Sequence, residues 1–273
     1  MNSVAIAPFR APARAFDTVA EDYDRIFTNS AIGRAQRDAV WEVARTVFSP
    51  GSRILELNCG TGEDAFFLSG LGMNVCAYDA SENMIAVARS RQVREAPRSS
   101  VDFHVLPTEN LATLRRLPQF DGAFSNFGGL NCVTNLAEVG RQLASLVKPG
   151  GAVVLTLCSR VCLWEIAWFL SHGNARRAFR RVRGRTTATL NDVPVDVQYR
   201  TVREIRAALH PWFGLRRVKS IGLAVPPSYL EHWAHRHREL LAVMRSIDSI
   251  ASEWPILRVL GDHLLLVLER TEA

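Results

Sequence analysis

Ile54 to Ala65 reads ILELNCGTGEDA, an apolar, strand-like run that breaks into a loop containing Gly60 and Gly62 and restarts as a helical pattern. Small residues at a strand-to-helix turn let ligand atoms approach the backbone, and the first amide groups of the helix point out of the turn. The stretch therefore predicts a binding loop for a nucleotide-like cofactor.

Short β-rich runs and helical patterns alternate on both sides of this loop. The runs RILELN, NVCAYD, VDFHVL, DGAFSN and GAVVLTL are typical of strands, and helical patterns over 63–71, 82–91 and 136–147 lie between most of them. Such a βαβ series predicts an α/β fold with a Rossmann-like, doubly wound sheet, whose ligands bind at the carboxyl ends of the strands. The apolar run GDHLLLVLER predicts a buried strand at the end of the chain.

Length and composition favour one domain over 1–273 with an inserted segment, because 273 residues with 48% hydrophobic content show no composition shift. The N-terminal stretch has no long apolar run and carries Arg10 and Arg14, so we expect a cytoplasmic protein without a signal peptide. The five cysteines form no CxxC pair and no Cys/His metal pattern, and we expect reduced thiols and no metal site. The net charge of +6 is almost entirely arginine, which indicates codon bias more than a nucleic-acid partner.

Two ligand classes compete for the loop, because residues 60–65 also satisfy the dinucleotide pattern GxGxxA. The loop is flanked by Glu56, Glu63 and Asp64, with Arg53 the only nearby cation in sequence. Each contact of an acid with a pyrophosphate at about 4 Å would cost on the order of a few kcal/mol at an effective dielectric constant near 20. A cationic ligand such as S-adenosylmethionine fits better, and an NAD(P)-dependent oxidoreductase is the alternative.

Five motifs then occur in a familiar order: FDTVAEDYD, LELNCGTGEDA, YDASENMIAVAR, FDGAFSNFGGLN and LVKPGGAVVL. With them, roughly Phe16 to Leu157 resembles the class I S-adenosylmethionine-dependent methyltransferases, in particular the small-molecule branch that includes the ubiquinone and menaquinone biosynthesis methyltransferases. The resemblance implies S-adenosylmethionine as cofactor and S-adenosylhomocysteine as product. It also implies a mostly parallel sheet with an antiparallel last strand, and cofactor-covering helices over 1–48.

The resemblance also implies a set of cofactor-binding residues. They are Glu56, Asn58, Gly60 and Gly62 at the methionine end, Asp79 at the ribose with Ser81 and Met84 beside it, Asn126 and Phe127 after the fourth strand, and Tyr23 and Arg37 above the ligand. A solvated position on a polar helix face is the alternative for Arg37.

The sequence departs from the family pattern at two places. Asn58 stands where the family usually has glycine, and asparagine is among the few residues that tolerate a left-handed backbone. Pro107 and Thr108 replace the usual Asp-Ala that reads the adenine, so we expect adenine contacts from Thr108, Glu109 or backbone amides.

The acceptor side is less defined. After the fourth strand the chain reads SNFGG from Ser125 to Gly129, not the Asn-Pro-Pro-aromatic motif of enzymes that methylate nucleic-acid bases, so we expect no nucleic-acid partner. Residues 160–200 are predicted to form a lid: the apolar helix VCLWEIAWFLSH, an arginine-rich segment and a hairpin that turns at 191–192. We expect Trp164, Trp168 and Tyr199 to bind the acceptor, with core packing as the alternative for the tryptophans. Membrane contact through the lid would be peripheral at most. A packed amphipathic helix is predicted over 229–247.

These patterns together predict transfer of a methyl group from S-adenosylmethionine to a small, partly apolar acceptor at carbon or oxygen. A non-catalytic S-adenosylmethionine-binding protein is a further alternative beside the oxidoreductase. The leaving group of such a reaction is already cationic, so alignment and water exclusion can supply much of the catalysis. A base is needed only for an acceptor that loses a proton, and His104, Tyr199 and His263 are candidates. The sequence assigns no catalytic residue, acceptor identity or oligomeric state.

Overall fold

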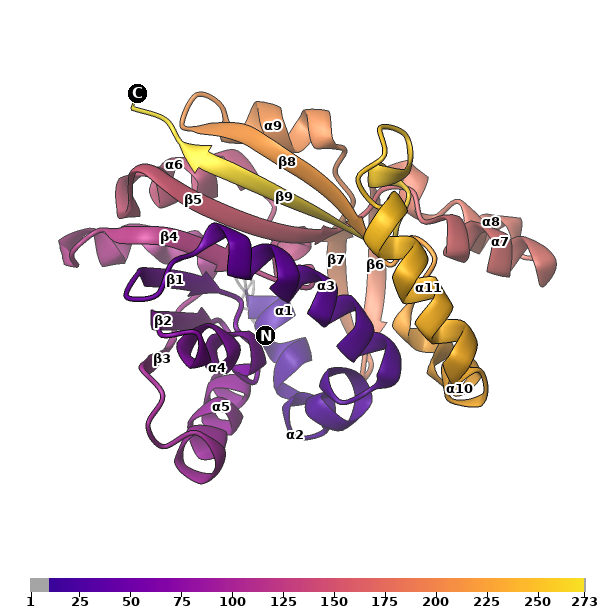
Figure 1. The fold of residues 1–273 in the computed structure, drawn as a ribbon, viewed down its shortest axis with the longest axis horizontal. Coiled ribbons are helices and arrows are strands. Elements are labelled where there is room, and N and C mark those ends of the chain that lie inside the picture. The colour runs from indigo at the N-terminus through magenta and orange to yellow at the C-terminus, as the bar shows by residue number, and fades with distance from the viewer. Residues whose placement is uncertain (1–9, 273) are drawn as a thin grey trace, which may run out of the picture.

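Seven strands form one sheet at the centre of the molecule in the computed structural model, which describes residues 10–272 (Figure 1). The strands are β1 (Arg53–Leu57), β2 (Asn74–Asp79), β3 (Val101–Val105), β4 (Phe120–Ser125), β5 (Val147–Cys158), β8 (Phe213–Ile221) and β9 (His263–Arg270). Their order is β3-β2-β1-β4-β5-β9-β8, and β9 runs antiparallel to both of its neighbours. This arrangement confirms the predicted mostly parallel sheet with an antiparallel last strand.

Helices cover both faces of the sheet, as a βαβ series requires. One face carries α3 (Ala31–Val47), α4 (Glu63–Gly70) and α5 (Glu82–Glu95), which lie in front of the strands in Figure 1. The other carries the short helix η2 (Thr108–Arg116), α6 (Leu136–Leu146) and α9 (Val202–Leu209). Side chains of Ser30, Ser81 and Thr201 cap α3, α5 and α9, because each accepts a backbone N–H from the first turn.

The N-terminal helices reach the carboxyl ends of the strands. They are α1 (Arg10–Asp17), α2 (Ala20–Tyr23) and the π-helical turn η1 (Asp24–Thr28). The Asp17 carboxylate accepts the Ser81 hydroxyl at 2.5 Å and the Asn83 amide at 3.1 Å, which ties α1 to the start of α5. Residues 1–9 of the predicted covering segment over 1–48 lie outside the described residues.

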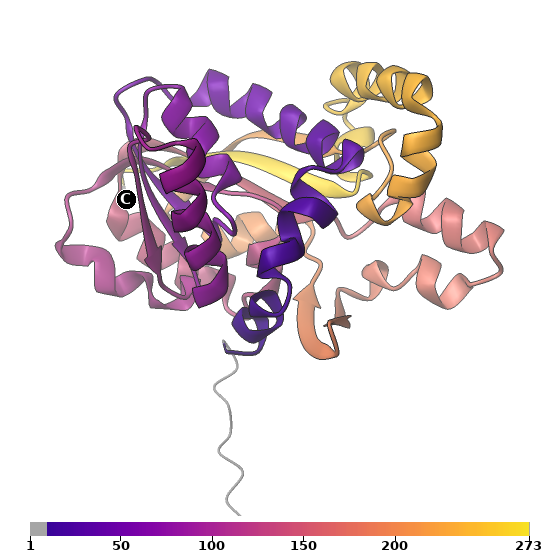
Figure 2. The same cartoon turned by 90° about the horizontal axis from the view of Figure 1, so that it is seen from below.

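The inserted segment contains two helices and a hairpin. The elements are α7 (Leu163–Ser171), α8 (Ala175–Ala178), the turn η4 (Arg181–Arg183), β6 (Arg185–Leu190) and β7 (Val193–Gln198). Figure 2 shows α7 and α8 projecting away from the sheet. The predicted hairpin is confirmed, and Asn191 and Asp192 have the positive φ angles, 44° and 62°, that a two-residue hairpin loop requires. The Asn191 amide donates to the carbonyl of Thr18 at 3.1 Å, so the hairpin lies against the end of α1.

The C-terminal third departs from the prediction in two ways. Strand β8 was not predicted, and the single helix expected over 229–247 is wrong. The chain instead forms the turn η5 (Ser228–Leu230), α10 (Glu231–Arg236) and α11 (Arg238–Ala251), with a break at His237, and then the turn η6 (Leu257–Val259). Leu240 and Ile247, expected in the packed face, are exposed. No helix in residues 10–272 combines the length and apolar character needed to cross a membrane.

Candidate active site

The loop after β1 has the left-handed backbone that its residues suggest. Asn58, Gly60 and Gly62 have φ angles of 56°, 54° and 83°, so asparagine does adopt the conformation expected of the usual glycine. The Asn58 side chain accepts the Thr108 hydroxyl at 3.0 Å and donates to the Ser125 hydroxyl at 3.3 Å. Asn58 therefore joins the loop after β1, the segment after β3 and the last residue of β4 at the carboxyl ends of the strands.

Asp79, the last residue of β2, binds the backbone of this loop. Its carboxylate accepts the backbone N–H of Gly60 and that of Ser81, both at 2.9 Å. Burial raises the pKa of Asp79 above its ordinary value, although these amides oppose the shift. The carboxylate faces the pocket above the loop.

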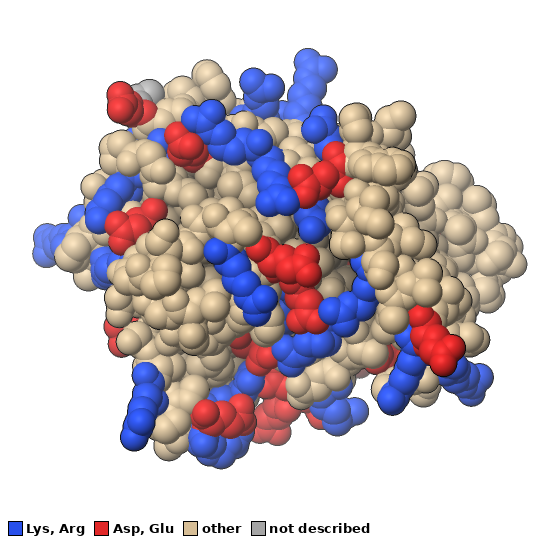
Figure 3. Space-filling model, in the orientation of Figure 1, with Lys and Arg blue, Asp and Glu red and all other residues tan. Residues whose placement is uncertain are grey.

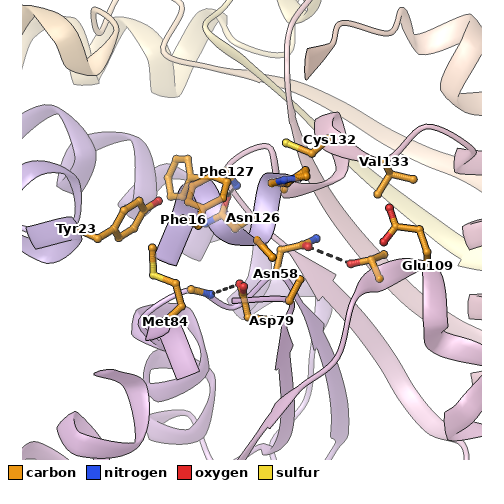
Figure 4. A pocket seen from close by; sticks show the side chains of 16 residues that line it. Phe16, Tyr23, Asn58, Asp79, Met84, Glu109, Asn126, Phe127, Cys132 and Val133 are labelled. Atoms are coloured by element: carbon orange, nitrogen blue, oxygen red, sulfur yellow. Dashed lines mark hydrogen bonds between the residues drawn. The ribbon is translucent and has the colours of Figure 1, made fainter. Parts of the chain in front are cut away.

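A pocket of about 700 Å³, which includes its open mouth, lies over the carboxyl ends of β1, β2 and β4 (Figure 4). Nine of the predicted cofactor residues line it: Tyr23, Asn58, Gly60, Asp79, Met84, Thr108, Glu109, Asn126 and Phe127. The lining residues from α1 and from the segment after β4 were not predicted; they are Pro12, Ala13, Phe16, Gly129, Cys132 and Val133. Phe16 in FDTVAEDYD carried a signal, because that motif was expected to cover the cofactor.

Gly62 and Ser81 were also predicted to bind the cofactor, and both support the pocket from outside its lining. A Cβ at Gly62 would lie 2.6 Å from the ring of Phe103, so this glycine allows α4 to approach β3. Ser81 is fully buried, caps α5 and donates to Asp17.

Arg53 is the only nearby cation in sequence, but the fold brings other arginines to the acids of the loop. Glu63 pairs with Arg34 at 2.9 Å and with Arg91 at 2.7 Å. Arg53 is at the other end of β1, where its backbone N–H donates to Asp121. Arg34 and Arg91, the two partners of Glu63, lie on α3 and α5. Because they neutralise its charge, Glu63 adds little electrostatic repulsion against an anionic ligand.

Asp64 is neutralised as well. It accepts Arg37 at 2.5 Å, the indole N–H of Trp41 at 2.6 Å and the Asn126 amide at 3.2 Å. Arg37 is only 3% exposed, which excludes the solvated alternative for it. The charge argument for a cationic ligand therefore depends on Glu56 alone.

Glu56 is a buried acid on β1 that lies outside the pocket lining. It is 1% exposed, and one of its carboxylate oxygens has no hydrogen-bond partner among the described residues. Burial, with the nearby charge of Asp64, raises the pKa of Glu56 well above its ordinary value. The buried Nε of Arg37 also has no partner there. Arg37, like Glu56, lies outside the pocket lining, and the two atoms without partners are an oxygen and an N–H that fit the ammonium and the carboxylate of an amino-acid moiety.

Phe127 forms the wall between this pocket and the core. Its φ of 49° is rare for a residue other than glycine, and such strained backbones concentrate at functional sites. The Arg37 guanidinium lies 4.8 Å from its ring centroid, and the rings of Phe27 and His263 lie at 4.9 Å and 5.4 Å. The ring is therefore held from three sides.

The residues predicted to bind the acceptor lie elsewhere than in the pocket lining. The Trp164 indole donates to the Ala224 carbonyl at 2.6 Å, and Trp164 and Trp168 pack in a separate apolar cluster with α3, α10 and α11. Tyr199 is buried beside Arg181, and burial raises the pKa of Tyr199 to about 12. The contacts of the tryptophans favour the core-packing alternative.

The candidate bases also lie outside the lining. His104 is exposed and stacks on Tyr78 with ring centroids 5.3 Å apart. His263 is buried behind Phe127, with its Nδ1 3.5 Å from Asp262. The Asp262 carboxylate opposes the effect of burial and raises the pKa of His263.

A buried ion-pair network anchors α7 to the sheet. Glu165, the only charge of the predicted apolar helix, accepts Arg180 at 2.7 Å and Arg181 at 2.8 Å. Arg181 also pairs with Asp262 at 2.8 Å, directly before β9. Part of the arginine-rich segment is thus internal structure, not a solvated face.

Comparison with known proteins matches residues 54–151 to a family described as a methyltransferase domain. The chain is 34% identical over 145 residues to a demethylmenaquinone methyltransferase of Clavibacter sepedonicus, covering 51% of this chain and 55% of that protein. It is 31% identical over 124 residues to a ubiquinone biosynthesis O-methyltransferase of Xanthomonas campestris, covering 43% and 48%. The chain thus spans about half the length of these two relatives.

Two further matches extend over most of the chain. An uncharacterised protein, MJ1252 of Methanocaldococcus jannaschii, is 24% identical over 229 residues, which are 81% of this chain and 82% of that protein. The crystal structure of an S-adenosylmethionine-dependent methyltransferase from Mesorhizobium loti shares the fold, with a TM-score of 0.53 and 20% identity over 85% of this chain and 98% of that one.

Proposed function

We propose that this class I S-adenosylmethionine-dependent methyltransferase transfers the methyl group to a small, partly apolar acceptor at carbon or oxygen. The observation that carries the proposal is the lining of the pocket beyond the glycine loop. Phe16, Phe127, Cys132 and Val133 are largely apolar, and Glu109 is the charged group among them (Figure 4). Such a lining suits a compact acceptor with one polar end.

The names of the two partial relatives agree with this acceptor class. One acts on demethylmenaquinone and the other is an O-methyltransferase of ubiquinone biosynthesis. We extend to this chain only the chemical character that such acceptors share, a ring system that carries oxygen.

The residues present fit the cofactor. Glu56 would hold its ammonium, Arg37 its carboxylate and Asp79 its ribose hydroxyls. Gly60 leaves space, because a Cβ built there meets no protein atom within 4 Å. The bound cofactor supplies a methyl group on a sulfonium. Phe16 and Phe127 exclude water from that end of the pocket and orient the acceptor.

The test is calorimetric titration with S-adenosylhomocysteine beside NAD, followed by incubation with methyl-labelled cofactor and metabolite extracts. We expect binding of S-adenosylhomocysteine only, and a labelled product whose fragmentation places the label on carbon or oxygen. Binding of NAD with no response to S-adenosylhomocysteine would favour the oxidoreductase. Cofactor binding with no labelled product from any extract would favour the non-catalytic alternative.

Replacing Asp79 with alanine should weaken S-adenosylhomocysteine binding. Charge-assisted hydrogen bonds of this kind contribute about 1.5–3 kcal/mol, which corresponds to roughly a 10- to 150-fold loss of affinity. Asp102→Ala is the matched control, because Asp102 is an exposed carboxylate on the neighbouring strand β3. Equal affinities of the two variants, measured by calorimetry, would contradict the ribose assignment.

Cofactor binding should also depend on pH through Glu56. The raised pKa keeps this carboxyl protonated in the free protein up to a higher pH than usual, while a bound ammonium favours its ionised form. Binding should therefore release a proton below the raised pKa, and affinity should increase with pH by at most about tenfold per unit. Calorimetry in buffers of different ionisation enthalpy measures this proton.

The variant Glu56→Gln distinguishes proton release by Glu56 from proton release by other titrating groups. The variant should bind S-adenosylhomocysteine more weakly and should lose the proton that Glu56 releases. Proton release of the same size in Glu56→Gln would show that another group, such as Asp79, is responsible.

A further inference from the structure

Helix α11 presents an apolar stripe to solvent. Its apolar positions 240, 243, 247 and 250 alternate in spacings of three and four, and 254 continues the pattern beyond the helix end. The exposed members are Leu240 (43%), Val243 (55%), Ile247 (46%), Ile250 (68%), Trp254 (56%) and Ile256 (75%). We call these six residues the α11 stripe.

The stripe is not explained by packing within the chain. Leu241, Asp248 and Ala251 form the inward side of α11 and are buried. Isolated exposed apolar residues are ordinary, whereas a contiguous row of them marks an interaction surface. Figure 3 shows a mostly uncharged surface over α11 and the neighbouring α7 and α8.

A basic groove continues from the end of this stripe. It lies between α9, β8 and the segment that contains η6, and five arginines line it: Arg203, Arg206, Arg216, Arg217 and Arg258. Glu253 is the only acid in the lining. We call this feature the arginine groove.

Three of these arginines form no ion pair with an acidic residue among residues 10–272. Arg217 pairs with Glu253, and Arg216 pairs with Glu269 outside the lining. Within residues 10–272, no ion pair or side-chain hydrogen bond involves Arg203, Arg206 or Arg258, and all three are exposed. The groove therefore has an excess of positive charge that its own chain does not neutralise.

The stripe and the groove form one continuous surface. Trp254 and Ile256 flank Pro255, which lines the groove, and the backbone N–H of Arg258 donates to the carbonyl of Trp254 at 2.9 Å. The apolar and the cationic parts are therefore joined by five consecutive residues.

We propose that this surface binds an anionic lipid bilayer, with the α11 stripe at the acyl boundary and the arginine groove on headgroup phosphates. Tryptophan and aliphatic side chains beside arginines are the composition of interfacial membrane-binding helices. A two-fold dimer through this surface would bring two copies of the same arginines to one interface, whereas an anionic bilayer supplies the missing charge. The surface is distinct from the arginine-rich segment over 176–185, and the proposal does not depend on the acceptor.

The experiment is co-sedimentation of the full chain with vesicles of phosphatidylcholine alone and of phosphatidylcholine mixed with phosphatidylglycerol. We expect binding to the mixed vesicles only. Each arginine near an anionic surface contributes about 1 kcal/mol, so replacing Arg203, Arg206 and Arg258 together with alanine should lower the partition coefficient roughly a hundredfold.

The matched control replaces Arg98, Arg115 and Arg116 with alanine. These are also exposed, change the net charge equally and lie in the segments that precede and follow the opposite edge strand, β3, in the sequence. A second variant, Val243→Gln with Ile247→Gln and Ile250→Gln, should weaken binding at unchanged charge. Titration with S-adenosylhomocysteine verifies that each variant is folded.

Three outcomes would overturn the proposal. Equal losses in the two arginine variants would reduce the interaction to net charge. Binding of inorganic phosphate at low concentration, without vesicle binding, would make the groove a site for a soluble anion. A concentration-dependent dimer in sedimentation velocity, abolished by the glutamine variant, would make the stripe an interface between copies of the chain.

Discussion

Replacing Arg37 with alanine should lower the free energy of unfolding by about 3–5 kcal/mol, because it leaves the buried Asp64 carboxylate without its charged partner. The side chains of Arg37 and Asp64 are 4% and 7% exposed, so water cannot take over the role of the guanidinium. The folded fraction should also bind S-adenosylhomocysteine more weakly, since Arg37 is proposed to hold its carboxylate.

Denaturant titration with and without S-adenosylhomocysteine measures both effects. Arg45→Ala, in the exposed part of the same helix α3, is the control and should change stability by less than about 1 kcal/mol. Adding Asp64→Ala to Arg37→Ala should recover part of the lost stability, because the isolated charge is gone. A fully stable Arg37→Ala protein would mean that Asp64 does not depend on this ion pair.

Replacing Glu165 with alanine should cost a similar amount, about 3–5 kcal/mol, for the opposite reason that two guanidinium groups lose their shared carboxylate. Glu165 is 1% exposed and Arg181 is 7% exposed. Cofactor affinity of the folded variant should remain unchanged, because Glu165 and Arg181 neither line the pocket nor are among the residues proposed to hold the cofactor.

Thermal melts beside cofactor titrations test this second prediction. Glu138→Ala is the comparison, because Glu138 forms an exposed pair with Arg141, and it should cost no more than about 1 kcal/mol. If Glu165→Ala melts like the wild type yet turns over acceptor poorly, α7 would act as a mobile lid rather than as a packed element.

The sequence predicted the sheet and the loop because their signals are local. Strands β1 to β5 each follow from one apolar run, and the left-handed Asn58 follows from a turn motif within a few residues. Strand β8 was missed because FGLRRVKSI interrupts its apolar residues with three cations and carries a register shift between Leu215 and Arg217.

Long-range pairing explains the other differences. The arginines that neutralise Glu63 and Asp64 lie 27 to 29 residues away on α3 and α5, and charge spacing along the loop cannot indicate them. Trp164 lies in an apolar helix of the kind expected of a lid. Its indole, however, is held by a hydrogen bond to the Ala224 carbonyl, 60 residues later in the chain. The ion pairs of the loop and the position of Trp164 therefore depend on contacts between distant segments, which a local sequence pattern does not contain.

Different physical constraints act on the three left-handed positions of the glycine loop. We therefore expect the three positions to change at different rates in evolution. At Gly62 any side chain collides with Phe103, so the fold itself opposes change. At Gly60 no protein atom lies within 4 Å of an added Cβ, so the left-handed φ of 54° and the ligand, but not packing, would select for glycine. At Asn58 a return to glycine would relax the backbone but abolish the bonds to Thr108 and Ser125. A lineage that lost cofactor binding would therefore be expected to vary first at position 60 and last at position 62.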